Sequence, residues 1–195
     1  MSKNLEFGIL KFRNYLYSMS KRDLKKYLGE LTKEQLEEQL VELYEKFAPV
    51  KVYYDFVFNP KEDKLLQEAK VKISHEYFPI KKPGAKWRPK AKMRRSVAQK
   101  LIKHFMMLGV DSYIVADIML YNIEIAQTFS SQNFIKQELF YKSMLNSFEQ
   151  AVNFIVSNGI FNDFKLRINA IQTETLEQKW KNKYEFGAIL EKIDY

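Results

Sequence analysis

The chain has 195 residues, a length that suits one domain with a proper core. Hydrophobic residues make up 46% and charged residues 29%, which excludes a disordered tail. There is no cysteine, so disulfides, thiolate nucleophiles and cysteine-ligated metal sites are excluded too. Only six Gly and five Pro are present, which favours long helices over many short strands. Since no apolar run approaches the roughly 20 residues needed to span a bilayer, we expect a cytoplasmic protein that does not enter a membrane.

The first 18 residues differ from the rest of the chain. Their small apolar cluster is interrupted by charged side chains, which fits a secretory signal peptide poorly. Met1-Ser2-Lys3 is echoed by Met19-Ser20-Lys21. We therefore expect residues 1–18 to form a leader or extension, outside a single helical domain over residues 19–195.

Two helix starts are visible in the first third of this domain. Thr32 and Gln35 form a capping box, and apolar residues at helical spacing follow until Pro49. Asn59 predicts a second N-cap, with Pro60 at the first helical position.

The segment between these helices can be interpreted in two ways. Residues 50–58 alternate like a strand, yet their apolar side chains also fit helical spacing. A lone strand would have no partner elsewhere in this chain, so we predict a helix.

The middle of the chain predicts a helical hairpin over residues 93–129. Gly109 suits the C-terminal cap of the first helix, and Asp111 can cap the second. So short a connection makes the two helices antiparallel. The second helix is apolar on nearly every side, which is typical of a central, surrounded element.

A long helix over residues 133–158 follows, then shorter helices over 161–171 and 174–184, and a tail from about residue 185. The predicted fold is therefore all-α, an irregular multi-helix bundle of antiparallel helical hairpins.

One stretch concentrates the positive charge. The whole chain is +8, but outside this stretch it carries 22 cations and 24 acids. Between Tyr77 and Val110 there is no Asp or Glu and there are ten cations: Lys81, Lys82, Lys86, Arg88, Lys90, Lys92, Arg94, Arg95, Lys100 and Lys103. Basicity so localised has two interpretations, a solvated face of the protein or a contact surface for an acidic partner.

Pro and Gly residues predict a basic loop over residues 78–92, which leads into a helix carrying Arg95 and Lys103 on its polar face. Trp87 could stack on an unpaired base. We expect a non-catalytic protein that binds nucleic acid or another polyanion. The predicted contacts are Lys81, Lys82, Lys86, Trp87, Arg88, Lys90, Lys92, Arg94, Arg95 and Lys103. The alternative is a helical adaptor whose basic loop docks on an acidic protein.

The two arginines also have a structural interpretation. Asp117, Tyr121 and Glu124 lie along one side of the predicted central helix as buried polar residues. Buried carboxylates almost always have a cationic partner, and Arg94, Arg95 or the nearby helix could supply it.

Catalytic motifs are missing. The sequence lacks a Walker loop, a dinucleotide-binding glycine motif, a nucleophile elbow and a zinc-binding His-Glu-x-x-His, so we predict no cofactor, no metal and no catalytic residue. Asp117 and Glu124 could in principle hold Mg²⁺ in a metal-dependent enzyme, which stays a remote alternative.

Several blocks occur in an order that resembles a family of small bacterial cytoplasmic proteins with a domain of unknown function. These blocks are Met19–Leu24, Tyr53–Phe56, Asn59–Leu65, Arg94–Ala98, Gly109–Asp111 and Leu120–Tyr121. The likeness covers about residues 19–171, and the family transfers no catalytic residue to this chain.

Overall fold

The structure is a computed structural model, and it describes residues 19–81, 83–87 and 89–193. Within this part of the chain there are nine helices and no strand, which confirms the all-α fold. None of these helices is both long enough and apolar enough to cross a membrane. The contacts of the described residues fall into two compact units that divide between Asp55 and Phe56, and each unit is described by itself. Residues 1–18, which we expect to be a leader or extension, lie outside the described residues.

The first unit contains α2 (Lys21–Gly29), α3 (Lys33–Lys46) and most of α4 (Ala48–Phe58). The predicted capping box at α3 is confirmed, since Thr32 N–H donates to Gln35 and Gln35 N–H donates to the Thr32 hydroxyl. The helical interpretation of residues 50–58 is confirmed as well. Pro49 lies in the first turn of α4, where its missing N–H costs no hydrogen bond.

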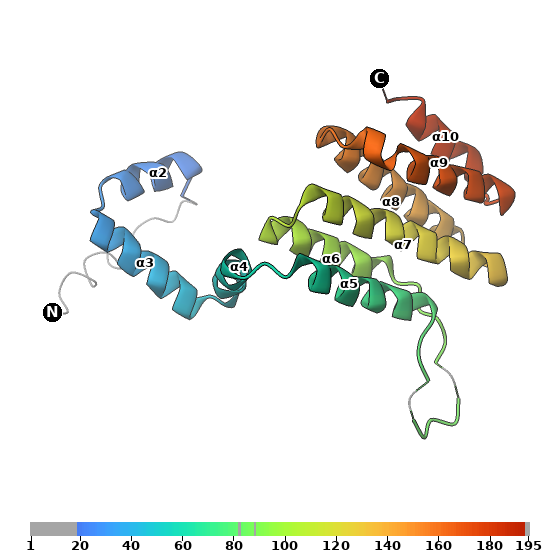
Figure 1. Cartoon of the computed structure of the whole chain (residues 1–195), viewed down its shortest axis with the longest axis horizontal. Coiled ribbons are helices and arrows are strands. Elements are labelled where there is room, and N and C mark those ends of the chain that lie inside the picture. Colours follow the sequence, from blue (N-terminus) through green and yellow to red (C-terminus); the bar gives the residue numbers. More distant parts are fainter. Residues whose placement is uncertain (1–18, 82, 88, 194–195) are drawn as a thin grey trace. The chain divides into compact units, whose positions relative to one another are not determined.

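The second unit is a bundle built around α7 (Ser112–Gln132). On one side α7 packs against α5 (Glu62–Tyr77) and α6 (Arg95–Leu108), and on the other against α8 (Glu138–Ser157) and α9 (Phe161–Glu177) (Figure 1). A last helix, α10 (Lys183–Leu190), packs against α8 and α9. Because α7 has neighbours on both sides, its apolar residues are buried around the helix, as its sequence predicted.

The predicted hairpin of α6 and α7 is also confirmed. Gly109 ends α6 with φ 71°, in the left-handed region where a side chain is strained. Asp111 caps α7 by accepting a 2.7 Å hydrogen bond from the Tyr113 N–H.

Two helices begin later than we predicted. α5 begins at Glu62, not at Pro60, and its N-cap position is Lys61, so Asn59 does not cap it. In the same first turn, the Glu62 carboxylate accepts a 3.1 Å hydrogen bond from the Asp111 N–H. α6 begins at Arg95 because Met93 has φ 50°, which is incompatible with a right-handed helix.

Three predictions near the C-terminus were wrong. α8 begins at Glu138, after an extended stretch in which Ile135 is buried. The two short helices predicted over 161–184 are the single α9 and the start of α10. The predicted tail from about residue 185 is mostly helical, since Phe186 of α10 is fully buried against Phe148. Burial of an aromatic ring supplies stabilisation that a free tail lacks.

Candidate functional site

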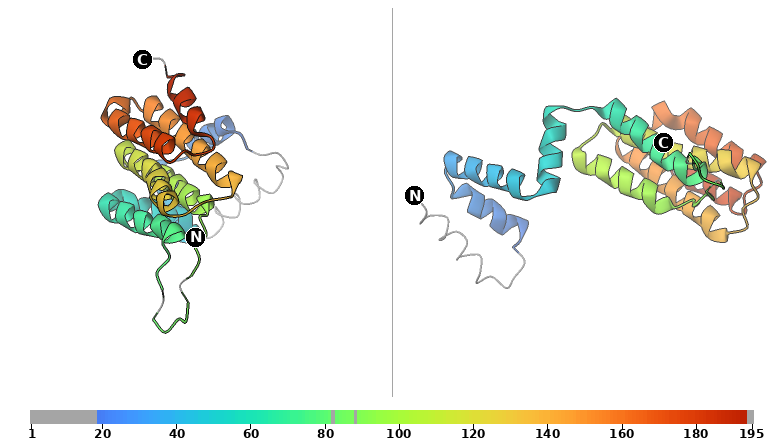
Figure 2. Two further views of the ribbon diagram at one scale, coloured as in Figure 1. Left: turned by 90° about the vertical axis from the view of Figure 1, so that its right-hand side faces the viewer. Right: turned by 90° about the horizontal axis from the view of Figure 1, so that it is seen from below.

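The basic loop, predicted over residues 78–92, lies in the connection between α5 and α6, which spans residues 78–94. From here on the whole connection is called the basic loop. Its described part projects away from the helices of the second unit (Figure 1; Figure 2). Both ends of this loop meet at Glu76, in the last turn of α5. Contacts of Glu76 therefore hold the C-terminal end of the loop close to the end of α5.

The Glu76 side chain binds Arg94. The guanidinium donates to the two carboxylate oxygens from Nε at 2.9 Å and from Nη2 at 2.8 Å, and the Arg94 N–H donates at 3.3 Å. Hydrogen bonds from Arg94 hold the pKa of the Glu76 carboxyl below its usual range, against the opposing effect of burial. Arg94 is thus neutralised within the fold.

The Glu76 backbone holds the same end of the loop. Its carbonyl accepts hydrogen bonds from the N–H groups of Lys92, at 2.9 Å, and Met93, at 3.0 Å. Two N–H groups can converge on one carbonyl here because Met93 takes its left-handed conformation. One residue thereby closes the base of the whole loop.

Arg95 takes no part in the projecting loop. Its Nε donates to Ser147 at 3.0 Å and its Nη2 donates to Gln150 at 3.1 Å, both on α8. These partners are neutral, and burial lowers the pKa of Arg95. Arg95 therefore links α6 to α8 through two hydrogen bonds.

Unlike Arg94 and Arg95, which bind other residues of the fold, the described lysines of the loop lie at solvent-exposed positions. Lys81, Lys86, Lys90 and Lys92 are exposed, and the first three form no ion pair with any acid in the described part of the chain. Among them the Trp87 side chain is 78% exposed. Lys82 and Arg88, which were also predicted contacts, lie outside the described residues.

Lys100 and Lys103 extend the basic surface beyond the loop. Both are exposed on α6. Lys103 lies about 12 Å along the helix from Arg95, at 1.5 Å per residue. The cations of this stretch that the structure describes therefore separate into six exposed lysines, on the loop and on α6, and two arginines that bind other residues of the fold.

The cations that pair with the polar residues of α7 are Arg167 of α9 and Lys70 of α5, so the suggestion of Arg94 or Arg95 was wrong. Arg167 donates to Glu124 from Nε at 2.5 Å and from Nη2 at 2.8 Å, and to Asp117 from Nη1 at 2.5 Å. Lys70 binds the other oxygen of Asp117 at 2.5 Å. All four side chains are half-buried.

Tyr121 belongs to the same cluster. Its hydroxyl lies 2.5 Å from the hydroxyl of Ser74 on α5, and the Lys70 ammonium lies 5.2 Å from the centre of its ring. The cluster therefore ties α7 to α5 and α9 through charges and hydrogen bonds.

Arg167, Lys70 and Glu76 were missed by the sequence reasoning, although a signal was present. Arg167 lies three residues after Phe164 and four before Ile171, both buried. On α5, Lys70 lies three residues before the buried Ile73, and Glu76 lies three residues after it. A charged residue at the spacing of an apolar stripe predicts a partner across the interface.

The two carboxylates considered for Mg²⁺ are both bound to Arg167. Within the described residues, no group of three or more acidic or histidine side chains could hold a metal ion. The geometry thus supports a structural role for Asp117 and Glu124.

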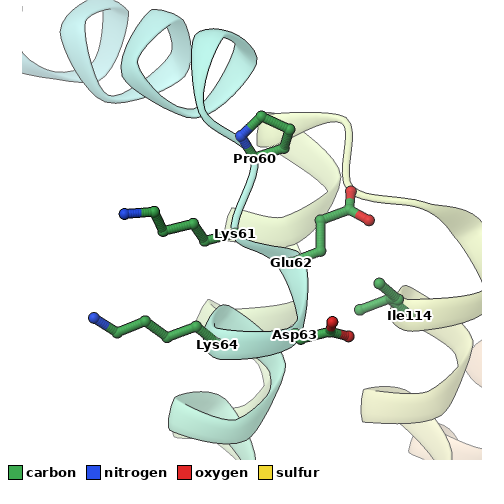
Figure 3. Close-up of a pocket in the computed structure, with 6 residues that line it drawn as sticks. All are labelled: Pro60, Lys61, Glu62, Asp63, Lys64 and Ile114. Carbon is green, nitrogen blue, oxygen red and sulfur yellow. The ribbon is translucent and has the colours of Figure 1, made fainter.

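A pocket of about 570 Å³ lies at the start of α5, lined by Pro60, Lys61, Glu62, Asp63, Lys64 and Ile114. Figure 3 shows Lys61 and Lys64 pointing to one side, with the two acids turned toward α7. Glu62 already accepts the Asp111 N–H. Nothing in this pocket combines a free nucleophile, a base and an oxyanion donor.

Comparisons with known proteins agree with the resemblance noted in the sequence. Searches of curated proteins and of solved structures found no match. One family model matches residues 19–194, which is most of the chain. The chain therefore belongs to DUF6155, a family of unknown function.

Proposed function

We propose that this protein binds single-stranded nucleic acid through the basic loop between α5 and α6. The observation that carries the proposal is a projecting loop with exposed, unpaired lysines on either side of an exposed tryptophan. The ligand is a polyanion with unpaired bases, and no catalytic step is involved.

The electrostatic part of the proposal rests on Lys81, Lys86 and Lys90. An ion pair with an acidic residue of the protein would neutralise these lysines, and no such pair forms in the described part of the chain. A lysine that neutralises a phosphate releases a condensed counterion, which is the main source of affinity for nucleic acid. Lys92, Lys100 and Lys103 could continue the contact toward α6.

Trp87 favours nucleic acid over an acidic protein surface. A tryptophan that is 78% exposed gains little from the fold, since most of its ring stays in water. Stacking on an unpaired base would cover the ring, and such stacking is worth about 1–3 kcal/mol per base. Bases in a duplex are already stacked, so the preferred ligand is single-stranded.

The Glu76–Arg94 pair supports the proposal by fixing the base of the loop. A binding loop whose ends are fixed loses less conformational freedom on binding than a free segment does. The pair also explains why Arg94 is not counted among the ligand contacts.

Fluorescence anisotropy with a labelled single-stranded oligonucleotide at low salt tests the proposal. The test variant is Lys81→Gln with Lys86→Gln and Lys90→Gln. The matched control is Lys72→Gln with Lys136→Gln and Lys142→Gln, which removes the same charge from exposed lysines elsewhere in the second unit. We expect the test variant to weaken binding at least tenfold and the control to change it less than threefold. Equal losses in the two variants would reject the loop as the binding site.

An acidic protein partner is the competing outcome. Such a partner would use the same lysines but gain little from Trp87. Wild-type protein that binds no oligonucleotide, yet captures a partner from lysate after nuclease treatment, would replace this proposal with the adaptor function.

A further inference from the structure

The basic loop contains a turn, formed by Pro83 and Gly84, that divides it into two limbs. Gly84 has φ 78°, the positive value that the second central residue of a type II turn takes after proline. The first limb runs from α5 to this turn, and the second limb runs from the turn back to α6 (Figure 1). The loop therefore presents two neighbouring stretches of chain to a ligand.

Both limbs are fixed to the bundle where they begin and end. In the first limb, the Phe78 N–H donates to the Ser74 carbonyl at 2.7 Å, and the Phe78 ring lies 5.6 Å from the ring of Phe129 on α7. The second limb is held by Glu76. Among the described residues no backbone hydrogen bond joins one limb to the other. A ligand group can therefore enter between the limbs without breaking a ladder like that of a β-hairpin.

Each limb leaves one large apolar side chain in water. Ile80 is 66% exposed and Trp87 is 78% exposed, and neither packs against the hydrophobic core. Ile80 lies three residues before Pro83, and Trp87 lies three residues after Gly84, so both are equally far from the turn along the chain. Two exposed apolar side chains at matched positions favour a ligand that covers both of them.

Positive charge accompanies this apolar pair. Lys81 and Lys86 are each one residue nearer to the turn than Ile80 and Trp87, and both lysines are exposed. The ligand must therefore combine a group with apolar faces and an anionic chain that carries this group. An unpaired nucleobase on its phosphate backbone has both properties.

We propose that Ile80 and Trp87 hold one unpaired base between the two limbs, while Lys81 and Lys86 bind the phosphates on either side of that base. This inference rests on the proposed function. It adds Ile80 as a second base contact and restricts the apolar contact to one base for each loop. A base splayed out of a single strand, a bulge or a hairpin loop can enter such a site, whereas a base within a duplex cannot.

Fluorescence anisotropy with labelled heptathymidylate tests the role of Ile80 in the full chain. Ile80→Ala should weaken binding about three- to tenfold, because it removes carbon atoms that the base would cover. The matched control is Leu166→Ala, which removes the same number of carbon atoms from a side chain that is 85% exposed on α9. The control should stay within about twofold of the wild type. Equal affinities of the two variants would overturn the proposal.

A double-mutant cycle tests whether Ile80 and Trp87 contact the same base. In a Trp87→Ala protein the base is no longer held on one side, so adding Ile80→Ala should weaken binding by less than about twofold more. Fully additive losses would overturn the proposal, because the two side chains would then contact separate bases. The thermal midpoint should not change in these variants, since both side chains are exposed.

Two modified oligonucleotides separate contacts with the base from contacts with the backbone. Both keep every phosphate of heptathymidylate, but one has a single central thymine among abasic sugars and the other is wholly abasic. Ile80→Ala should weaken binding of the first about as much as that of heptathymidylate, and it should leave binding of the second unchanged. Equal losses for the two would overturn the proposal, because Ile80 would then contact the backbone.

The same measurements distinguish this inference from the proposed function. Binding that is lost in Lys81→Gln with Lys86→Gln and Lys90→Gln, yet unchanged in Ile80→Ala, would reject the two-sided base contact and keep the basic loop as the binding site. Wild-type protein that binds none of these oligonucleotides would reject the proposed function itself.

Discussion

The Arg167 guanidinium binds Glu124 through two hydrogen bonds, from Nε at 2.5 Å and from Nη2 at 2.8 Å. The two residues belong to α9 and α7, 43 positions apart in the sequence. A two-point contact of this kind fixes the orientation of both groups, so it aligns one helix on the other. The same guanidinium reaches Asp117, which Lys70 binds from α5. Three helices are thereby held through one half-buried cluster.

Replacing Arg167 by Met should lower the free energy of unfolding by about 1–3 kcal/mol, since two half-buried carboxylates would lose their main partner. Urea denaturation measures the change. Lys142→Met, at an exposed position on α8, serves as the control and should stay within about 0.5 kcal/mol of the wild type. A stability of Arg167→Met equal to that of the control would contradict the role given to the cluster.

Glu76 should make the protein sensitive to acid. Its pKa is lowered in the folded state by Arg94, so the unfolded chain takes up the proton first as the pH falls. The stabilisation is complete above the ordinary glutamate value of 4.5 and is lost as the pH falls through the lowered pKa. Denaturation of wild type and Glu76→Gln at pH 7, 4 and 3 should show their difference shrinking toward pH 3. A difference that does not depend on pH would be inconsistent with the pairing.

Gly109 should resist substitution. Its φ of 71° is a conformation in which a β-carbon is strained, although nothing lies within 4 Å of the added atom. Gly109→Ala should therefore cost about 1 kcal/mol of unfolding free energy through backbone strain alone. Gly29→Ala, where the space is also open and φ is not positive, is the control and should not destabilise. Equal effects at the two glycines would contradict this explanation.

Trp87→Ala should weaken binding of a single-stranded oligonucleotide about 5- to 150-fold, the equivalent of 1–3 kcal/mol of stacking. Binding of a duplex should change much less. Trp87→Phe keeps an aromatic face and should retain most of the affinity. Because the ring is exposed, the thermal midpoint should not move in either variant. Equal loss for single strand and duplex would show that Trp87 does not stack on bases.

Local signals in the sequence were sufficient for much of the fold. The capping box of Thr32 and Gln35, the Gly109 cap and the all-round apolarity of α7 depend on nearby residues, and each was confirmed. The predictions failed where the bounds of a helix depend on contacts between residues far apart in the sequence. Phe186 orders α10 only because Phe148 lies beside it, and the start of α6 depends on the conformation that Met93 adopts where the loop closes on Glu76.

The candidate site was predicted from the sequence as a set of charges, but not as an arrangement. Charge counting identifies the acid-free stretch, yet it cannot separate the exposed Lys86 from Arg94, which Glu76 neutralises from 18 residues away. Likewise, the spacing on α7 placed Asp117 and Glu124 on one side but did not identify Arg167, because α9 approaches them only in the folded bundle.

The salt dependence of oligonucleotide binding tests the central claim most directly. For single strands, each phosphate contact adds about −0.7 to the slope of log affinity against log salt concentration. Anisotropy titrations from 50 to 300 mM salt should therefore give a slope about 2 units shallower for Lys81→Gln with Lys86→Gln and Lys90→Gln than for wild type. The control with Lys72, Lys136 and Lys142 changed to Gln should keep the wild-type slope. Identical slopes in all three proteins would contradict a phosphate-binding loop between α5 and α6.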